Sequence, residues 1–212
     1  MQFIGPLSKT HCIFAGDLLN FGKDKPAESE VQRDKYCRLF LKKECVYALS
    51  PAPLDEGSFI LGIAKTLFDR PLDSTAAIWV YGYTKDSKIF KVTNDTMFNN
   101  YEDFESEVKD KMTIVPNVSP GKNSRRLSFR AVSLPRYFKD EGHNANCIVF
   151  LTAVNNVNAF ENATLKTSFS KEVAVSLKSV DVSSIVPKGE AIKVSRGYTK
   201  DDVDRVMKAI LK

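Results

Sequence analysis

Basic side chains gather in one stretch of the chain, and their chemistry suits phosphate. Between Lys111 and Lys139 there are seven Lys and Arg residues and neither Asp nor Glu. Ammonium and guanidinium groups bind the phosphates of lipids and of nucleic acids. The candidate binding residues are Lys122, Arg125, Arg126, Arg130, Arg136 and Lys139, joined by Lys166 from a later strand. The alternative is a solvated sheet face whose charges are balanced by acids elsewhere in the fold.

A second candidate feature is apolar. Met97 and Phe98 form a pair within the polar stretch TNDTMFNN. Large apolar side chains at a loop tip suit insertion into a membrane or into a pocket of a partner. In the alternative, Phe98 folds back and fills the core.

The sequence offers few of the residue patterns that enzymes use. The phosphate loops GxxxxGK[ST] and GxGxxG, the nucleophile elbow GxSxG and the zinc motif HExxH do not occur. Two histidines, His11 and His143, are few for acid–base catalysis. We interpret Asp201, Asp202 and Asp204 as first-turn acids of a helix rather than as a metal cluster. We therefore expect a binding or assembly protein that uses neither a cofactor nor a metal.

Composition narrows the class of protein further. The chain has 212 residues, of which 43% are hydrophobic and 27% charged, and its net charge is +5, as in an ordinary globular domain. Its longest uncharged apolar stretch, Cys147–Val154, is too short to span a bilayer. Because the first residues also lack a signal-peptide pattern, we expect a cytosolic protein. Buried thiols are then expected for Cys12, Cys37, Cys45 and Cys147.

Apolar periodicity predicts the elements that position these residues. Alternating or continuous apolar runs predict strands at 10–19, 37–49, 76–83, 88–92, 125–131, 147–154 and 163–177. A helix is the alternative for 37–49, because Cys37, Leu41, Cys45 and Leu49 also lie four residues apart. Stripes at helical spacing predict helices at 55–68, at 101–112 and at the C-terminus, the last with Thr199 as N-cap and Asp202 in a capping box. After Lys178 the alternation changes parity, which a bulge would explain.

The strands do not alternate regularly with long helices, and this favours an α+β fold. We predict an antiparallel, β-rich, sandwich-like sheet with two or three packed helices. Residues 1–35 are assigned to an N-terminal arm that holds one strand and a charged linker. Residues 36–212 are assigned to a single globular domain.

The order of elements from Tyr36 to Thr84 resembles that of rhabdovirus matrix proteins, through the segments CRLFLKKECVYAL, GSFILGIAKTLF and AAIWVYGYT. Later, SLPRYFKD followed by CIVFLTAV is similar to the proline-led segment and strand late in those proteins. The resemblance implies a non-enzymatic viral structural protein that forms homo-oligomers. It would bridge an anionic membrane surface and a nucleocapsid or its RNA. It would lie in the host cytoplasm, at the inner face of the membrane and in the virion, and would not be secreted.

A second interpretation is that the chain resembles a degenerate von Willebrand A-like interaction domain. Strand Cys12–Gly16 would end at Asp17, with CIVFLTAV as its partner strand. That family's metal site needs DxSxS, but here Leu19 and Phe21 stand where the serines should be. Ala153 stands near the place of a second aspartate, so such a domain would bind no metal. This interpretation also requires a helix at 163–177.

A third interpretation is a single-stranded nucleic-acid-binding protein of the viral movement or coat type. It would use the same basic strand, with Phe129, Tyr137 and Phe138 available to stack on bases.

Overall fold

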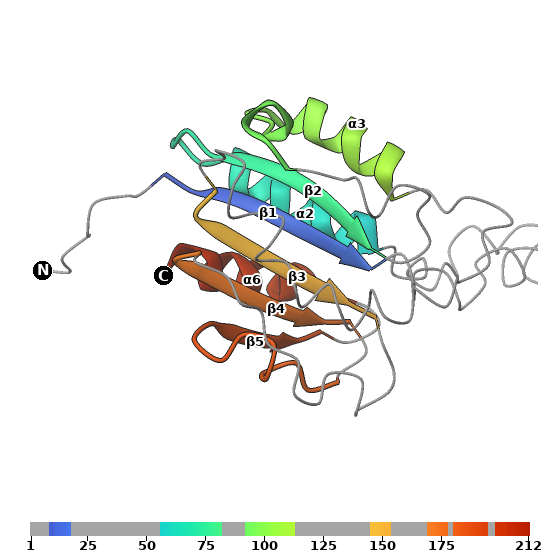
Figure 1. Ribbon diagram of the computed structural model, residues 1–212, viewed down its shortest axis with the longest axis vertical. Helices are drawn as coiled ribbons and strands as arrows, with labels where there is room; N and C mark the ends of the chain where they lie inside the picture. The colour runs from blue at the N-terminus through green and yellow to red at the C-terminus, as the bar shows by residue number, and fades with distance from the viewer. Residues whose placement is uncertain are drawn as a thin grey trace, which may run out of the picture.

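The computed structural model describes residues 9–17, 56–81, 92–112, 145–153, 169–177, 180–194 and 198–212. The described strands form one five-stranded sheet in the order β2-β1-β3-β4-β5 (Figure 1). They are β1 (His11–Asp17), β2 (Thr75–Tyr81), β3 (Cys147–Thr152), β4 (Lys171–Ser176) and β5 (Glu190–Lys193). The described helices are α2 (Glu56–Phe68), α3 (Tyr101–Lys111), α6 (Lys200–Leu211) and the short 3-10 helix η1 (Asn94–Thr96).

Every pair of neighbouring strands in this sheet is parallel, so the predicted antiparallel sandwich is wrong and the fold is α/β. Period-two alternation shows that a segment is a strand but does not encode its direction. Strands of a parallel sheet are covered on both faces and have nearly continuous apolar sequences. Such continuous runs occur in β2 (TAAIWVY) and β3 (CIVFLT). Parallel neighbours also need a connection of about a dozen residues or more, and α2 lies in the connection between β1 and β2.

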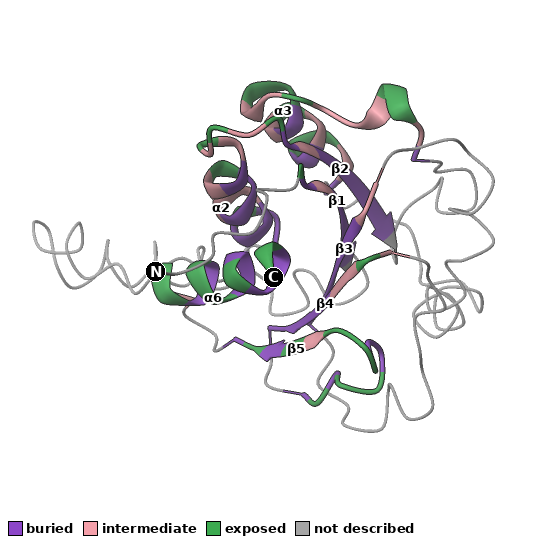
Figure 2. Cartoon of the chain, turned by 90° about the vertical axis from the view of Figure 1, so that its left-hand side faces the viewer, coloured by how far each residue is buried: buried purple, intermediate pink, exposed green. Residues whose placement is uncertain are grey.

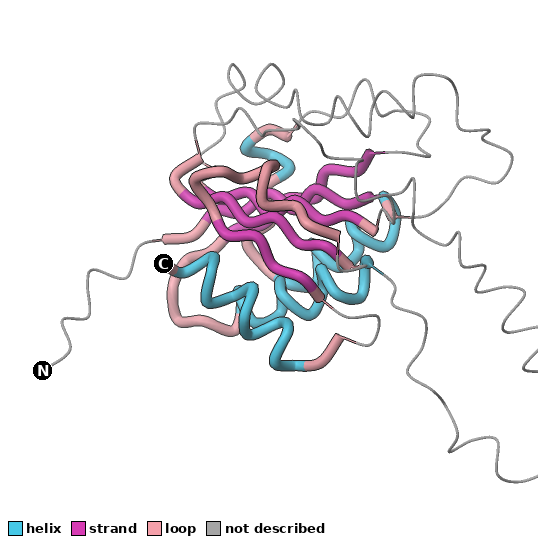
Figure 3. Tube along the Cα trace, turned by 90° about the horizontal axis from the view of Figure 1, so that it is seen from below, coloured by secondary structure: helices cyan, strands magenta, loops and turns pink. Residues whose placement is uncertain are grey.

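The three helices cover one face of the sheet (Figure 2). The view from below shows the same layering, with all three on one side of the strands (Figure 3). The core of this layer is built by the predicted apolar stripes of α2 and α6 and by alternate strand residues such as Phe14, Val149 and Val175. Aromatic rings add to it, with the ring centroids of Phe14 and Phe104 5.7 Å apart. This helix-covered face is called the helix face.

The opposite face of the sheet is also buried. Ile13, Ile148 and Phe150 on this face have no solvent exposure. The segment that follows β4 packs against them through Val180, Val182, Ile185 and Val186. The bulge predicted near Lys178 lies outside the described residues. β4 ends at Ser176 and residues 180–189 form no strand, so the even-numbered valines belong to a segment packed on this face and not to a continued strand.

Most of the predicted elements that fall on described residues are confirmed. These are the strands at 10–19, 76–83 and 147–154 and the helices at 55–68, 101–112 and the C-terminus. The strand predicted at 163–177 is confirmed over Lys171–Ser176, so the helix needed by the second interpretation is not formed there. The sequence does not predict β5, which has only four residues. The predicted strands at 37–49 and 125–131, most of that at 88–92, and the domain boundary after residue 35 lie outside the described residues.

Cys12 and Cys147 stand opposite each other in β1 and β3 and are joined by a disulfide bond. Both residues are fully buried, as predicted for the cysteines. The prediction of separate thiols is wrong for this pair, because the parallel register of β1 and β3 places their Cα atoms 4.4 Å apart. Cys37 and Cys45 lie outside the described residues.

Candidate functional site

The order of the strands defines a candidate binding site at one edge of the sheet. From β1 the chain passes to β2 on one side, and later to β3 on the other side of β1. Open α/β sheets bind ligands at such switch points, just beyond the carboxyl ends of the strands. These ends lie on the right in Figure 1, away from the marked C-terminus. We call them the carboxyl edge, and the opposite ends of the strands the amino edge.

A row of mostly polar residues crosses the sheet at the carboxyl edge. Ala15 of β1 pairs with Phe150 of β3. Two residues further along both strands, Asp17 therefore lies opposite Thr152. The remaining partners follow from the register of the neighbouring strands. The row consists of Tyr81, Asp17, Thr152, Ser176 and Lys193. It spans the switch point between β1 and β3.

Two hydroxyl groups of this row, those of Thr152 and Ser176, are buried. Thr152 and Ser176 have no solvent exposure, and Ser176 Oγ has no hydrogen-bond partner among the described residues. Their carbonyl oxygens accept hydrogen bonds from Leu177 N at 2.9 Å and from Val194 N at 2.8 Å, so the ladder continues past the strand ends. Both hydroxyls therefore lie below the surface of the carboxyl edge.

A buried carboxylate lies on the helix face of the same edge. Glu56 is the first residue of α2 and has no solvent exposure. Its Oε1 lies 3.5 Å from the point where a Cβ atom on Gly16 would stand, and Met112 Sδ lies 2.7 Å from that point. A side chain at position 16 would therefore have to displace the flexible end of Met112. A carboxylate in the first turn of a helix is stabilised by the helix dipole.

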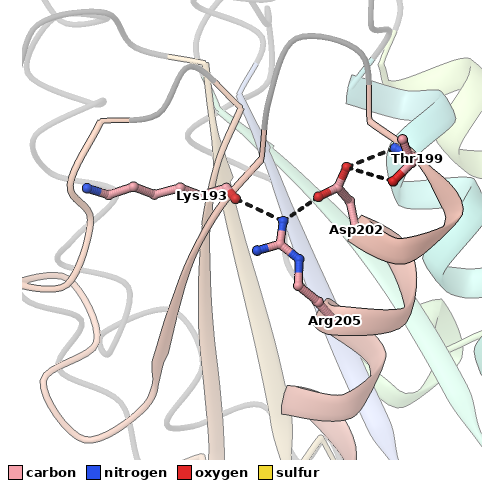
Figure 4. A network of polar contacts seen from close by, with 4 residues as sticks. All are labelled: Lys193, Thr199, Asp202 and Arg205. Atoms are coloured by element: carbon pink, nitrogen blue, oxygen red, sulfur yellow. Dashed lines mark hydrogen bonds and ion pairs between the residues drawn. The ribbon is translucent and has the colours of Figure 1, made fainter.

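Asp202 connects the start of α6 to the end of β5 (Figure 4). Thr199 N donates to Asp202 Oδ2 at 2.8 Å, in the capping box that the sequence predicts. The Arg205 guanidinium pairs with the other carboxylate oxygen and donates to the carbonyl oxygen of Lys193 at 3.1 Å. In Figure 4 the Lys193 amine points away from this network. The network thus fixes α6 against β5, while the Lys193 side chain stays exposed at the edge.

The electrostatic environment of Asp202 favours its charged form. Burial alone would raise the pKa of this carboxyl group. The hydrogen bond from the Thr199 backbone N–H and the Arg205 guanidinium outweigh burial, so the pKa lies below its ordinary value. Asp201 and Asp202 lie in the first turn of α6, as the sequence predicts, whereas Asp204 lies beyond that turn. No cluster of His, Cys, Asp or Glu in the described part of the chain is arranged to hold a metal ion.

The basic residues predicted to bind phosphate are not among those that the structure describes, and their role stays a prediction. They are Lys122, Arg125, Arg126, Arg130, Arg136, Lys139 and Lys166.

The predicted insertion pair does fall on described residues. Met97 and Phe98 are half-buried and follow η1. Phe98 exchanges two backbone hydrogen bonds with Ala76, of 2.8 and 2.9 Å, and its ring centroid lies 6.5 Å from that of Phe104. Among the described helices, none is long and apolar enough to cross a membrane. The membrane role of the pair stays a prediction.

Thr152, Ser176 and Lys193 are not singled out by the sequence analysis. The sequence does contain a signal for Thr152 and Ser176, because each is a polar residue at the end of an apolar strand. In a parallel sheet such strand ends meet at one edge. The signal could be used only once the strands were known to be parallel.

Comparison with models of known protein families gives no match for this chain, and no curated protein matches it. The fold and the carboxyl edge are therefore the basis for a functional assignment.

Proposed function

We propose that the protein is a non-enzymatic interaction domain of the von Willebrand A-like kind, which binds a partner protein at its carboxyl edge without a metal. One observation carries the proposal: β1, ending at Asp17, lies beside β3, followed by Ala153, at the switch point of a parallel sheet. This is the pairing of strands that the interpretation requires. The matrix interpretation assumed an antiparallel sandwich, which the sheet contradicts.

One expectation of this interpretation needs revision. It placed a helix at 163–177, whereas Lys171–Ser176 form β4. The revision leaves the switch point unchanged, because β4 lies on the far side of β3 from β1. Ser176 in turn extends the row at the carboxyl edge.

The residues at the switch point favour protein contacts over metal binding. Hard divalent cations need about six oxygen ligands, several of them usually carboxylates. In this chain Leu19, Phe21 and Ala153 supply no side-chain oxygen at the positions where that family has ligands. The exposed groups near this edge include Lys193, from the end of β5, and Lys200, from the start of α6. Such groups suit the polar rim of a protein interface.

The class of partner can be tested by three parallel binding measurements. Proteins cross-linked to the tagged chain in cells would be identified, purified and recombined with it in magnesium and in EDTA. Flotation with phosphatidylserine vesicles and a gel shift with single-stranded RNA would be run at two salt concentrations. We expect a complex with a purified protein, unchanged by EDTA, and neither vesicle flotation nor an RNA shift.

Each other outcome would contradict a stated part of the proposal. Salt-sensitive flotation without a protein complex would support the matrix interpretation. An RNA shift alone would support the movement or coat interpretation. A complex that forms only with magnesium would overturn the metal-free part.

A further inference from the structure

The short helix η1 contains a three-residue motif with a known chemistry. Asn94, Asp95 and Thr96 read Asn-x-Thr, and the middle residue is not proline. This triplet is the acceptor motif for N-linked glycosylation, which attaches a bulky hydrophilic group to the asparagine. Because so short a motif also arises by chance, it is informative only when the fold and the cellular compartment agree with it.

The fold presents Asn94 at the surface of the protein. Asn94 and Asp95 are both exposed. On one side of them Val92 is only 1% exposed and packs on the face of the sheet opposite the helix face. On the other side Phe98 exchanges two backbone hydrogen bonds with Ala76. The turn is thus fixed to the sheet at both of its ends, and a large group on Asn94 would extend into solvent.

The hydrogen bonds within the turn are compatible with such a group. Thr96 Oγ1 accepts from Thr93 N at 2.9 Å and donates to Thr93 O at 3.0 Å. Met97 N donates to Asn94 O at 3.1 Å. These bonds involve the Thr96 hydroxyl and backbone atoms, so a substituent on Asn94 Nδ2 would leave them intact.

The Cys12–Cys147 disulfide indicates the compartment in which this modification occurs. Disulfides form and persist in oxidising compartments and are rare in the cytosol. The acceptor motif belongs to surface loops of secreted proteins, which pass through such a compartment. The disulfide and the motif are independent observations, because they involve different residues and different chemistry. Together they argue against the cytosolic location that the sequence led us to expect.

We propose that Asn94 is an N-glycosylation site of this protein, and that the chain is modified in an oxidising secretory compartment. The co-reactant is an oligosaccharide carried on a lipid pyrophosphate. A bond forms between Asn94 Nδ2 and the anomeric carbon of the sugar, and the bond from this carbon to the pyrophosphate oxygen breaks. The lipid pyrophosphate leaves with the electron pair, and the amide nitrogen gives up one proton to a base of the transferase.

The proposal is limited to one site and does not rest on the function proposed above. The sequence contains two further acceptor triplets, at Asn117 and Asn162, but they lie outside the described residues. Asn94 is not part of the row at the carboxyl edge. Failure of one proposal would therefore leave the other unaffected.

Peptide mapping of the full-length protein, purified from the cells that produce it, tests the proposal. The protein would be treated in heavy-oxygen water with an amidase that releases N-linked glycans and converts the modified asparagine to aspartate. We expect position 94 to be recovered as aspartate that contains one heavy oxygen atom. A sample incubated without the amidase controls for spontaneous deamidation and should keep its glycopeptide. On a gel the treated protein should migrate at a lower apparent mass.

Substitutions within the turn separate the motif from the surrounding structure. Asn94→Gln removes the acceptor amide and Thr96→Val removes the hydroxyl of the motif, so each variant should lack one glycan. Thr96→Ser retains the motif and should keep the glycan. Asn99→Gln changes an exposed asparagine outside any acceptor triplet and should also keep it. Because Thr96→Val also removes the hydrogen bonds to Thr93, Asn94→Gln tests the acceptor most directly.

Three results would overturn the proposal. Unmodified Asn94 in a protein whose Cys12 and Cys147 are alkylated as thiols would place the chain in a reducing compartment. Unmodified Asn94 beside an intact disulfide would reject the site while keeping the compartment. An equal change in apparent mass for wild type and Asn94→Gln would mean that all glycans lie at other asparagines.

Discussion

At the scale of single residues, Asp202 joins two elements through one carboxylate. It accepts from Thr199 at the start of α6 and pairs with Arg205, which holds the end of β5. These contacts lower its folded pKa below the ordinary value of about 4. The stabilisation is therefore complete above the unfolded pKa and is lost as the pH falls through the folded pKa.

Asp202→Asn should lower the free energy of unfolding at neutral pH by about 1 kcal/mol, the size expected for losing a charge in the first turn of a helix together with a partly exposed ion pair. The difference in stability should shrink as the pH falls from neutral toward about 2, because the wild-type carboxylate loses its charge as the pH falls through its folded pKa. Urea unfolding at neutral pH and at pH about 2 measures this. Asp204→Asn, at an exposed position on the same helix, is the control and should change stability by less than about 0.5 kcal/mol. A constant difference between Asp202→Asn and wild type at both pH values would contradict the role given to the charge.

At the scale of elements, the segment from η1 to α3 is held in place by backbone hydrogen bonds to the sheet and by the aromatic ring of Phe98. Phe98 is bridged to Ala76 in β2 and packs near Phe104 of α3. Phe98→Ala should therefore lower the free energy of unfolding by about 1–3 kcal/mol, less than for a fully buried phenylalanine. Chemical denaturation measures the change.

Vesicle flotation of the same variant separates the two roles considered for this residue. Met97→Ser is tested beside it, because Met97 is the other half-buried residue of the predicted insertion pair. Loss of flotation in both variants, with stability unchanged, would support the insertion role and contradict the packing role.

The amphipathic helices were predictable because their signal is local. Phe59, Ile60 and Ile63 lie on one stripe of α2, and Thr199 caps α6, as the sequence predicts. The direction of the strands was not predictable from alternation, since Val173 and Val175 would alternate in the same way in either sheet. The length of the connections and the continuous apolar run of β3 did carry that information.

The candidate site could not be predicted without the direction of the strands either. Asp17 and Ala153 were identified as strand ends, but only a parallel sheet brings the two ends together. Thr152 and Ser176 look like ordinary polar residues until the register places them in one row.

At the scale of the whole molecule, the Cys12–Cys147 disulfide joins the two strands at the switch point and closes a loop of 135 residues. Constraining so long a loop in the unfolded chain stabilises the folded state. Reduction, or Cys12→Ser with Cys147→Ser, should lower the free energy of unfolding by about 2–5 kcal/mol. Unfolding with and without reductant measures this, and the double variant should not respond to reductant. An equal response of wild type and variant would contradict the bond.

The same bond bears on the expected cytosolic location. Disulfides persist in oxidising compartments and are rare in the cytosol. Trapping thiols in intact cells, followed by peptide mapping, shows the state of this pair. Recovery of Cys12 linked to Cys147 would favour an oxidising compartment, and recovery of both as alkylated thiols would favour the cytosol.

The central claim is that the carboxyl edge binds a protein partner. The most direct measurement compares the affinity of the purified partner for two charge-reversed proteins. Lys193→Glu with Lys200→Glu alters exposed positions at the carboxyl edge, whereas Lys188→Glu reverses an exposed charge before β5, at the amino edge. We expect the first protein to bind about tenfold more weakly, a loss of about 1.4 kcal/mol, and the second to bind as wild type. Equal affinities for the two proteins, or a loss confined to Lys188→Glu, would contradict the claim.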